Sequence, residues 1–301
     1  MFVECKQILG NTWCLLGHQL IPFYRTDSHH CILMDTGVQA LREEIETALE
    51  ENDLTPIGLL CTHTHFDHFG NARYFSEKYG CPVALPLGEA EICRTQASVK
   101  SHLYVYSARQ VAEDPELSQL PCLVDHVIRP EENDTLFRGV RFRVLHTPGH
   151  AMDHVSYLTP DNVCYVGDAL MCGRTLHTSR LPYAFDFRQS LDTIRALRDI
   201  RCEAMAVAHC GILYEGFADL ADENLAVMED RLAQVRALVD KPMSSDEICS
   251  AVCQHMGVQV NTVRKAQNLE RFLRPYMEYL VDSGSHRLML RGNSLCYAPV
   301  N

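Results

Sequence analysis

The chain has 301 residues, of which 47% are apolar and 22% charged, and its 39 acidic against 27 basic residues give a formal net charge of −12. This composition is ordinary for a globular protein with one large domain, or one domain and an appendage, and it excludes a disordered chain. No run of about 18 apolar residues occurs, which excludes a membrane-spanning helix, and the acidic excess disfavours nucleic acid and acidic membrane surfaces as partners. The first residues carry charges and no apolar signal core, so we expect a cytoplasmic protein.

The first two thirds of the chain alternate between strand and helix patterns. Apolar runs with a period near two predict strands, and apolar positions at helical spacing predict helices. The predicted elements are a strand meander over 2–34, a helix over 38–51, a strand over 57–62, a helix near 70–80, strands over 81–86, 140–145, 153–159 and 163–170, a helix over 189–200 and a strand over 204–209. The proline-containing residues 88–130 are less regular and only partly helical, over about 88–99, and we expect an insertion that covers a site. Residues 1–215 therefore predict an α/β domain.

The pattern changes from residue 216. A long helix ends near Pro242, a second begins at Ser245 with Ser244 or Ser245 as its cap, and a third covers about 262–282. Two short strands follow, joined by Gly292-Asn293, which is a hairpin turn signal. Residues 216–301 thus predict a small helical, winged-helix-like domain, which we also expect to be a contact in a homodimer.

Fourteen cysteines occur, and none forms a Cys-x-x-Cys pair. In a chain of this length without an export signal, they indicate reduced thiols rather than a disulfide framework. We expect all fourteen to act as small apolar packing residues.

The segment Thr-His-Thr-His-Phe-Asp-His at 62–68 contains a dense group of potential metal ligands. Four potential ligands, namely His63, His65, Asp67 and His68, lie within six residues directly after an apolar strand. In an extended segment His63 and His65 point to the same side, and a turn into a helix brings the other two to a neighbouring point. Imidazoles with one carboxylate suit zinc, iron or manganese, and the density of ligands indicates two ions.

Three later segments supply further ligands at the ends of predicted strands, where α/β folds gather functional groups. They contribute His150 from His-Thr-Pro-Gly-His at 146–150, Asp168 after a strand, and His209 after the last strand. The full predicted set assigns His63, His65 and His150 to one ion, Asp67, His68 and His209 to the other, and Asp168 to both. This pattern is typical of a two-metal hydrolytic site, in which a metal-bridging hydroxide attacks the substrate.

These motifs, with Asp35-Thr36-Gly37 and the later Ala-His-Cys-Gly, resemble the metallo-β-lactamase superfamily over residues 1–215. The resemblance implies an αββα sandwich, and the seven ligands match the dinuclear set of that family. It also implies that Asp67 accepts or shuttles a proton, that Asp35 supports the ligands from behind, and that His146 holds its loop.

The chain resembles one branch of this superfamily more closely, because that branch combines these motifs with a C-terminal winged-helix-like segment. This branch contains lactamase-beta-like endoribonucleases and uncharacterised hydrolases, and glyoxalase II shares the motifs. The endoribonuclease HR…RE signature after the last metal histidine has no clean counterpart in this sequence. Residues 216–301 carry nine basic against eleven acidic side chains, so we do not expect nucleic acid as a partner.

We therefore expect an enzyme, a dinuclear metal-dependent hydrolase of a small ester, thioester or lactone, with zinc as the first choice of metal. One alternative is a ribonuclease or other nucleic-acid-processing enzyme of the same fold. The other is an oxidoreductase similar to persulfide dioxygenases, which bind a single iron.

Several further side chains have positions near the predicted site in the sequence. His154 and His177 are candidates for substrate contact, and Tyr104, Tyr106 and Arg109 of the insertion are candidates for a pocket wall. The other histidines outside the ligand motifs, His102 among them, are expected at the surface or in the core.

Overall fold

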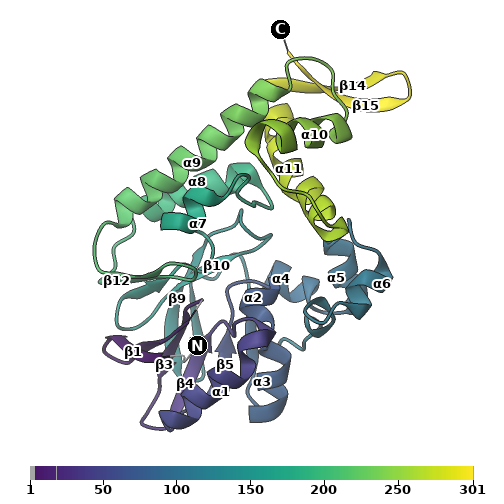
Figure 1. Cartoon of the computed structure of the whole chain (residues 1–301). Helices are drawn as coiled ribbons and strands as arrows, with labels where there is room; N and C mark the ends of the chain where they lie inside the picture. The colour runs from purple at the N-terminus through teal and green to yellow at the C-terminus, as the bar shows by residue number, and fades with distance from the viewer. Residues whose placement is uncertain (1–3, 18, 301) are drawn as a thin grey trace.

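The structure is a computed structural model that describes residues 4–17 and 19–300, and within these ranges the chain forms two large sheets packed face to face, with helices on both outer sides (Figure 1). The first sheet contains β1 (Glu4–Leu9), β2 (Thr12–Leu16), β3 (Ile21–Arg25), β4 (His30–Met34), β5 (Thr55–Leu60), β6 (Val83–Pro86) and β7 (His126–Ile128), in this spatial order. The second has the order β13 (Gly211–Leu213), β12 (Ala204–Val207), β11 (Val163–Tyr165), β10 (Val155–Leu158), β9 (Val140–His146) and β8 (Asp134–Phe137). The predicted αββα sandwich is confirmed.

The described residues also form helices, some of which cover the outer sides of the two sheets and some of which pack on other helices. They are η1 (Gln39–Leu41), α1 (Arg42–Glu51), α2 (Phe66–Phe69), α3 (Ala72–Tyr79), α4 (Leu87–Ile92), α5 (Gln96–His102), α6 (Ala108–Glu113), η2 (Leu117–Gln119), α7 (Gly173–Thr178), α8 (Phe187–Arg198), α9 (Phe217–Leu238), α10 (Ser245–Met256) and α11 (Val263–Asp282). Successive side chains of β4 show the layering, because Ile32 and Met34 pack between the sheets and Leu33 packs toward α1 and α3.

The insertion at 88–130 is helical where the sequence predicts helix, over about 88–99, and it contains two further helical segments that the sequence does not indicate. Its residues form α4, α5, α6 and η2, and Ser107 caps α6 through a capping box with Gln110. Strands β7, β8 and β13 are also absent from the sequence prediction. They have three or four residues each and lie at sheet edges, so they are too short to give a clear period of two.

The C-terminal segment forms α9, α10, α11 and a hairpin of β14 (His286–Arg291) and β15 (Ser294–Pro299), in the order that the sequence predicts. Ser244 is the cap of α10 and pairs with Glu247 in a capping box. One apolar cluster joins α8 to all three of these helices. The domain boundary at 215/216 stays a prediction.

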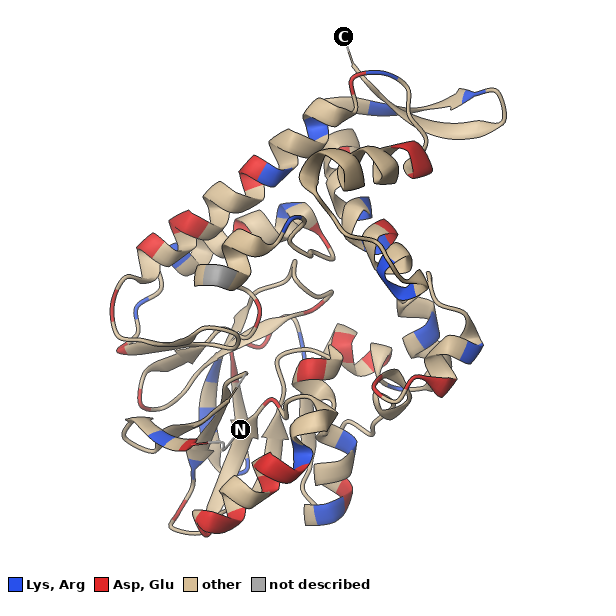
Figure 2. Cartoon of the chain, viewed as in Figure 1, with Lys and Arg blue, Asp and Glu red and all other residues tan. Residues whose placement is uncertain are grey.

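The N-terminal half of α11 reaches the insertion. Arg264 pairs with Asp114 at 3.1 Å and with Glu116 at 3.0 Å, and Gln267 Nε2 donates to the Val105 carbonyl oxygen at 2.7 Å. Basic positions recur along α11 where it passes α5 and α6 (Figure 2). The helix and the insertion therefore meet across one end of the sandwich.

The prediction that all fourteen cysteines are free is wrong for one pair. Cys172 and Cys210 form a disulfide, with their Cα atoms 5.7 Å apart. Cys172 follows β11 and Cys210 follows β12, and these two strands are parallel neighbours, so their following loops lie side by side. The other twelve cysteines, all within the described ranges, are free thiols and mostly buried.

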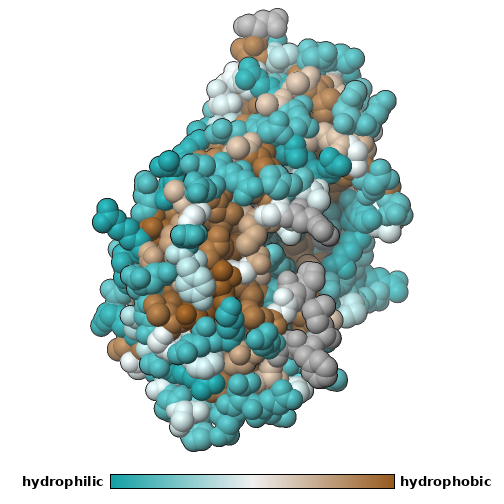
Figure 3. All heavy atoms as spheres, turned by 60° about the vertical axis from the view of Figure 1, so that its left-hand side comes forward, coloured by the Kyte–Doolittle hydropathy of each residue, from teal (hydrophilic) through white to brown (hydrophobic). Residues whose placement is uncertain are grey.

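The surface is largely hydrophilic, with an apolar area in the middle of the face shown in Figure 3. In the hairpin Leu288, Leu290 and Leu295 are at least half exposed. The homodimer contact expected in this segment stays a prediction. Within the described residues, we find no helix whose length and apolar character would let it cross a membrane.

Candidate metal centre

The loop after β5 divides its ligands between two points. His65 keeps an extended backbone (φ −63°, ψ 145°) and precedes α2, which begins at Phe66. His63 and His65 belong to the extended part, whereas Asp67 and His68 lie in the first turn of α2. The change from extended chain to helix therefore separates the four side chains into two pairs, as the sequence predicts.

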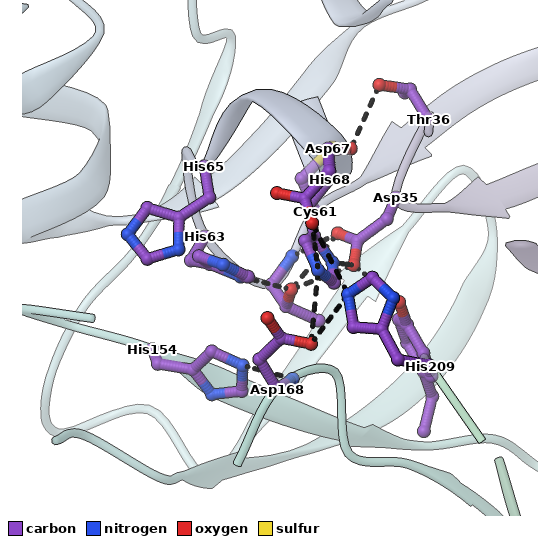
Figure 4. Close-up of polar contacts among 12 residues, drawn as sticks. Asp35, Thr36, Cys61, His63, His65, Asp67, His68, His154, Asp168 and His209 are labelled. Carbon is purple, nitrogen blue, oxygen red and sulfur yellow. Dashed lines mark hydrogen bonds and ion pairs between the residues drawn. The ribbon is translucent and has the colours of Figure 1, made fainter. Parts of the chain in front are cut away.

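The seven predicted ligands converge into two groups that share Asp168. Figure 4 labels all of them except His150. The first group contains His63, His65, His150 and Asp168, and the second contains Asp67, His68, Asp168 and His209; within each group the candidate ligand atoms all lie within 4.8 Å of one another. The closest approaches are His65 Nδ1–His150 Nε2 at 3.0 Å, His68 Nε2–Asp168 Oδ1 at 3.2 Å, and His150 Nε2–Asp168 Oδ2, His209 Nε2–Asp67 Oδ2 and His209 Nε2–Asp168 Oδ1 at 3.3 Å.

The polar atoms at the centre fit divalent cations. His63 Nε2, His68 Nε2 and Asp168 Oδ1 are buried and make no well-formed hydrogen bond within the described residues, although the last two atoms lie 3.2 Å apart. Burying a polar atom that makes no hydrogen bond costs free energy of folding. Several such atoms around one point therefore indicate that an ion binds between them. Imidazole nitrogens and carboxylate oxygens are ligands that zinc and iron accept, so the residues present fit the expected metals.

Asp35 orients His68 from behind the centre. It is fully buried and has a φ of +65°, a left-handed conformation that aspartate tolerates better than most residues. Its carboxylate accepts hydrogen bonds from the Thr62 amide at 2.7 Å and the Tyr165 hydroxyl at 2.6 Å, and its Oδ2 lies 2.8 Å from His68 Nδ1. Because a carboxylate only accepts, the His68 proton lies on Nδ1 and Nε2 faces the centre.

Two further contacts fix the first group. Thr62 Oγ1 lies 2.9 Å from His63 Nδ1, which leaves Nε2 of His63 for the centre. Gly149, which precedes His150, has a φ of +124°, and a Cβ there would lie 2.2 Å from the Ser190 backbone nitrogen. Only glycine therefore fits this position of the 146–150 motif.

The remaining predicted residues lie outside the two groups. His146 Nε2 lies 2.9 Å from the Glu132 carbonyl oxygen and ties its loop to the segment before β8. His154 is buried behind the centre, where its Nε2 accepts the Asp168 amide at 3.3 Å, so it supports a ligand and does not line the pocket. His177 is exposed and pairs with Glu223 at 2.6 Å.

Glu89 is a supporting residue that the sequence does not reveal. It is 1% exposed, and it accepts hydrogen bonds from the Thr64 amide at 2.9 Å, the Thr64 hydroxyl at 2.6 Å and the Asp153 amide at 3.2 Å. Burial raises the pKa of its carboxyl, although these donors oppose the shift. Because Thr64 separates His63 from His65, Glu89 fixes the loop that carries both.

Charges at the centre favour a cation. Burial, and then the neighbouring His68, hold the pKa of His63 well below its usual value, so its ring is neutral and able to bind a metal. Burial also lowers the pKa of His68, but the carboxylates of Asp168 and Asp67 outweigh burial and raise it well above the usual value. The carboxylates thus favour a positive charge at this point, which a divalent cation supplies as a proton does.

A pocket of about 240 Å³ opens beside the centre, between α4–η2 and α11. His65, Asp67, His150 and Asp168 form its floor, and the rest of its lining consists of Thr64, Phe66, Ile92, Val99, His102, Leu103, Tyr106, Leu117, Leu120, Tyr183, Arg264, Asn268, Arg271 and Phe272. The expectation that residues 88–130 cover a site agrees with this geometry.

The pocket wall differs in part from the one suggested by the sequence. Tyr106 lines the pocket and donates a hydrogen bond to Asn268, whereas Tyr104 and Arg109 are exposed and are not among the lining residues. His102, expected at the surface or in the core, lines the pocket instead. The sequence gives no signal for Arg271 and Tyr183 as pocket residues. They line the pocket because α11 and the segment before α8 pack beside it in the folded chain.

Comparisons with known proteins agree with this fold and these motifs. Residues 23–209 match the family model described as the metallo-beta-lactamase superfamily. A hydroxyacylglutathione hydrolase from Idiomarina loihiensis is 28% identical over 176 residues, which are 57% of this chain and 53% of the relative. A probable metallo-hydrolase from Bacillus subtilis is 28% identical over 156 residues, 52% of this chain and 68% of the relative. The chain thus matches about half the length of the first of these relatives.

Solved structures show that the likeness of fold extends into the C-terminal segment. A metallo-β-lactamase family protein from Thermus thermophilus has a TM-score of 0.72 at 22% identity, and the match covers 94% of both chains. A β-lactamase domain protein from Burkholderia ambifaria has a TM-score of 0.74 at 16% identity, and the match covers 99% of this chain and 94% of the other. With the matched family model covering well over half of its residues, the chain belongs to the metallo-β-lactamase superfamily.

Proposed function

We propose that this protein is a metal-dependent hydrolase that binds two divalent ions, zinc foremost, and cleaves a small ester, thioester or lactone. The observation that carries the proposal is the convergence of seven side chains into two groups that share Asp168. His63, His65 and His150 would hold one ion, and Asp67, His68 and His209 the other. Bound ions of this class polarise a carbonyl oxygen, lower the pKa of water and stabilise negative charge that develops during hydrolysis.

The protein side chains supply positioning and proton transfer. Asp67 is the ligand best placed for the proton, because its side chain is 28% exposed and lines the pocket. Its carboxylate accepts a proton from the attacking water and returns it to the leaving oxygen or sulfur as the bond to the acyl carbon breaks. The contact of Oδ2 with His209 Nε2 at 3.3 Å holds this carboxylate in place.

The relatives support a thioester in the substrate range, since several carry the name hydroxyacylglutathione hydrolase. The size of the pocket supports a small molecule: about 240 Å³ is below the range of about 300–1,000 Å³ for pockets that take drug-sized ligands. The second ligand group supports two ions over the single iron of a persulfide dioxygenase. We therefore keep hydrolysis of a small molecule ahead of nucleic-acid processing and of oxygen chemistry.

The test combines metal analysis of the purified protein with a panel of esters, thioesters and lactones. The wild type should contain two divalent ions per chain and hydrolyse part of the panel. Asp67→Asn should lower kcat about 10²–10⁴-fold, the usual contribution of a positioned general base. His177→Gln, which changes an exposed histidine outside the centre, is the control and should keep full activity.

Two outcomes would contradict the proposal. One is a doubly substituted Asp67→Asn, His65→Ala protein that hydrolyses the panel as fast as the wild type. The other is a single iron per chain with oxygen consumption on a persulfide, which would establish the dioxygenase alternative.

A further inference from the structure

The pocket beside the metal centre has an apolar wall and a cationic corner. Residues of α4, α5 and the segment up to η2 supply the apolar wall, which consists of Ile92, Val99, Leu103, Leu117 and Leu120. The corner is formed by Arg271 of α11 with His102 and Tyr183. A ligand that satisfies both parts needs a hydrocarbon portion and a negative charge.

Arg271 lacks a negative partner of its own. Its Nη2 donates to the Tyr183 hydroxyl at 2.7 Å and to His102 Nε2 at 3.2 Å, and its guanidinium carbon lies 4.8 Å from the centre of the Tyr183 ring. Both partners are neutral: burial, and then Arg271 itself, lower the pKa of His102 to about 4. Among the described residues no carboxylate forms an ion pair with Arg271, although it is half-buried.

Arg264, on the same helix and in the same pocket lining, shows the contrast. It is neutralised by Asp114 and Glu116, at 3.1 and 3.0 Å. A half-buried cation among apolar and neutral side chains is costly unless an anion joins it. The planar guanidinium group can form two parallel hydrogen bonds with a carboxylate. Arg271 can therefore bind a carboxylate group of the ligand.

Arg271 lies close to the reacting position. The Tyr183 ring on which it rests is 5.5 Å from the His65 ring and 5.4 Å from the His150 ring, measured between centres. Because the Tyr183 oxygen accepts from Arg271, its own proton remains available for a ligand oxygen. One aromatic side chain therefore separates the cation from two predicted metal ligands.

We propose, on the basis of the hydrolase function proposed above, that the substrate is an acyl ester or thioester that carries a carboxylate near the cleaved carbonyl and a short hydrocarbon chain. Arg271 binds the carboxylate with Tyr183 and His102 holding its fork. The apolar wall between α4 and η2 receives the chain. Arg271 is thus a specificity-determining residue contributed by the C-terminal segment to the site of the sandwich.

Three thioesters of one simple thiol test this assignment. The first has a 2-butylsuccinyl acyl group, the second has a carboxamide in place of its free carboxylate, and the third lacks the butyl chain. With the metal-loaded wild type, kcat/KM should be highest for the first. Loss of the butyl chain should lower kcat/KM at least about tenfold, because each buried methylene contributes to binding.

The variant Arg271→Gln distinguishes binding of the substrate carboxylate by Arg271 from a purely structural role of this residue. It should lower kcat/KM for the carboxylate substrate about 10- to 100-fold, the range for a lost charge-assisted hydrogen bond, and change the carboxamide substrate by less than about threefold. Arg274→Gln is the matched control: Arg274 lies on the same helix, is exposed, pairs with Glu278 and is not among the lining residues. This control should change neither substrate.

An equal loss for both substrates in Arg271→Gln would overturn the proposal and show a structural role, and a wild-type preference for the carboxamide would also overturn it. If the wild type cleaves none of the three but hydrolyses other members of the ester, thioester and lactone panel, the hydrolase proposal stands and the carboxylate substrate assigned here is wrong. If it hydrolyses nothing on that panel, the hydrolase proposal fails, and ligand binding then tests the role of Arg271 separately. Calorimetric titration of the metal-loaded proteins with hexanoate and with hexanamide should show weaker hexanoate binding to Arg271→Gln alone. Equal hexanoate binding to the wild type and this variant would overturn the assignment of Arg271.

Discussion

The carboxylate of Asp35 forms hydrogen bonds with residues from the sides of both sheets and with one predicted metal ligand. It accepts hydrogen bonds from Thr62 on the first sheet side and Tyr165 on the second, and it contacts His68 between them. Each of these groups is buried, so no water replaces a lost partner. The position of His68 therefore depends on one carboxylate.

Asp35→Asn keeps the side-chain shape but replaces one of the two carboxylate oxygens by an NH2 group, so the side chain can no longer accept from Thr62 with one oxygen and from His68 with the other. We expect zinc affinity at the second ligand group to fall about 10- to 100-fold, as is usual when the partner of a ligand histidine is lost. Competition with a coloured chelator measures the change. Asp161→Asn, which alters an aspartate that binds Asn11 and Thr12 away from the centre, is the control. An unchanged zinc affinity in Asp35→Asn would show that His68 needs no such support.

The residues that could be predicted from the sequence are those held in short motifs. All seven ligand candidates follow strands that carry clear patterns, and their clustering follows from strand ends meeting at one edge. Arg271, Tyr183 and Glu89 carry no such signal. Their positions depend on how α11, the segment before α8 and α4 pack, and that packing has no local period in the sequence.

At the scale of elements, the contact between α5 and α11 forms the pocket. His102 ends α5 and accepts from Arg271 of α11, and burial with this neighbour lowers the His102 pKa to about 4. A histidine whose folded pKa lies below its unfolded value stabilises the protein above pH 6.5, and this contribution is lost as the pH falls toward 4.

His102→Gln should therefore flatten the dependence of stability on pH. Between pH 6.5 and about 4 the wild type should lose up to about 3 kcal/mol more than the variant, from the size of the pKa shift. Urea unfolding at a series of pH values measures the difference. His255→Gln, at the exposed end of α10, serves as the control. Parallel curves for the wild type and His102→Gln would show that His102 does not titrate in this range.

The disulfide links the loops after β11 and β12, which carry Asp168 and His209. The bridged residues are 38 positions apart, and closing a loop of this length contributes about 2–4 kcal/mol. The double variant Cys172→Ala, Cys210→Ala should lose stability of this order under non-reducing conditions. Cys249→Ala, Cys253→Ala, which removes two free thiols of α10, should lose less.

Thiol counting checks the bond directly. The denatured wild type should show twelve reactive thiols without reductant and fourteen after reduction. Fourteen thiols in both conditions would restore the original expectation that every cysteine is reduced. The sequence could not indicate this pair, because neither spacing nor motif distinguishes it from the other cysteines.

At the scale of the whole molecule, the sandwich places strand ends from both sheets around one point. β5 supplies four ligand candidates, and β9, β11 and β12 of the second sheet supply the other three through their following loops. The family model covers this region, whereas the pocket also needs α11 beyond it. Alternating patterns and motifs sufficed to predict the layers, but the closure of the pocket by the C-terminal segment is a property of the folded chain.

The central claim is that two divalent ions occupy the two ligand groups. The most direct measurement is a crystal structure of the zinc-loaded protein with anomalous scattering recorded at the zinc edge. We predict two peaks, one among His63, His65, His150 and Asp168 and the other among Asp67, His68, Asp168 and His209. A single peak, or peaks away from these side chains, would contradict the account.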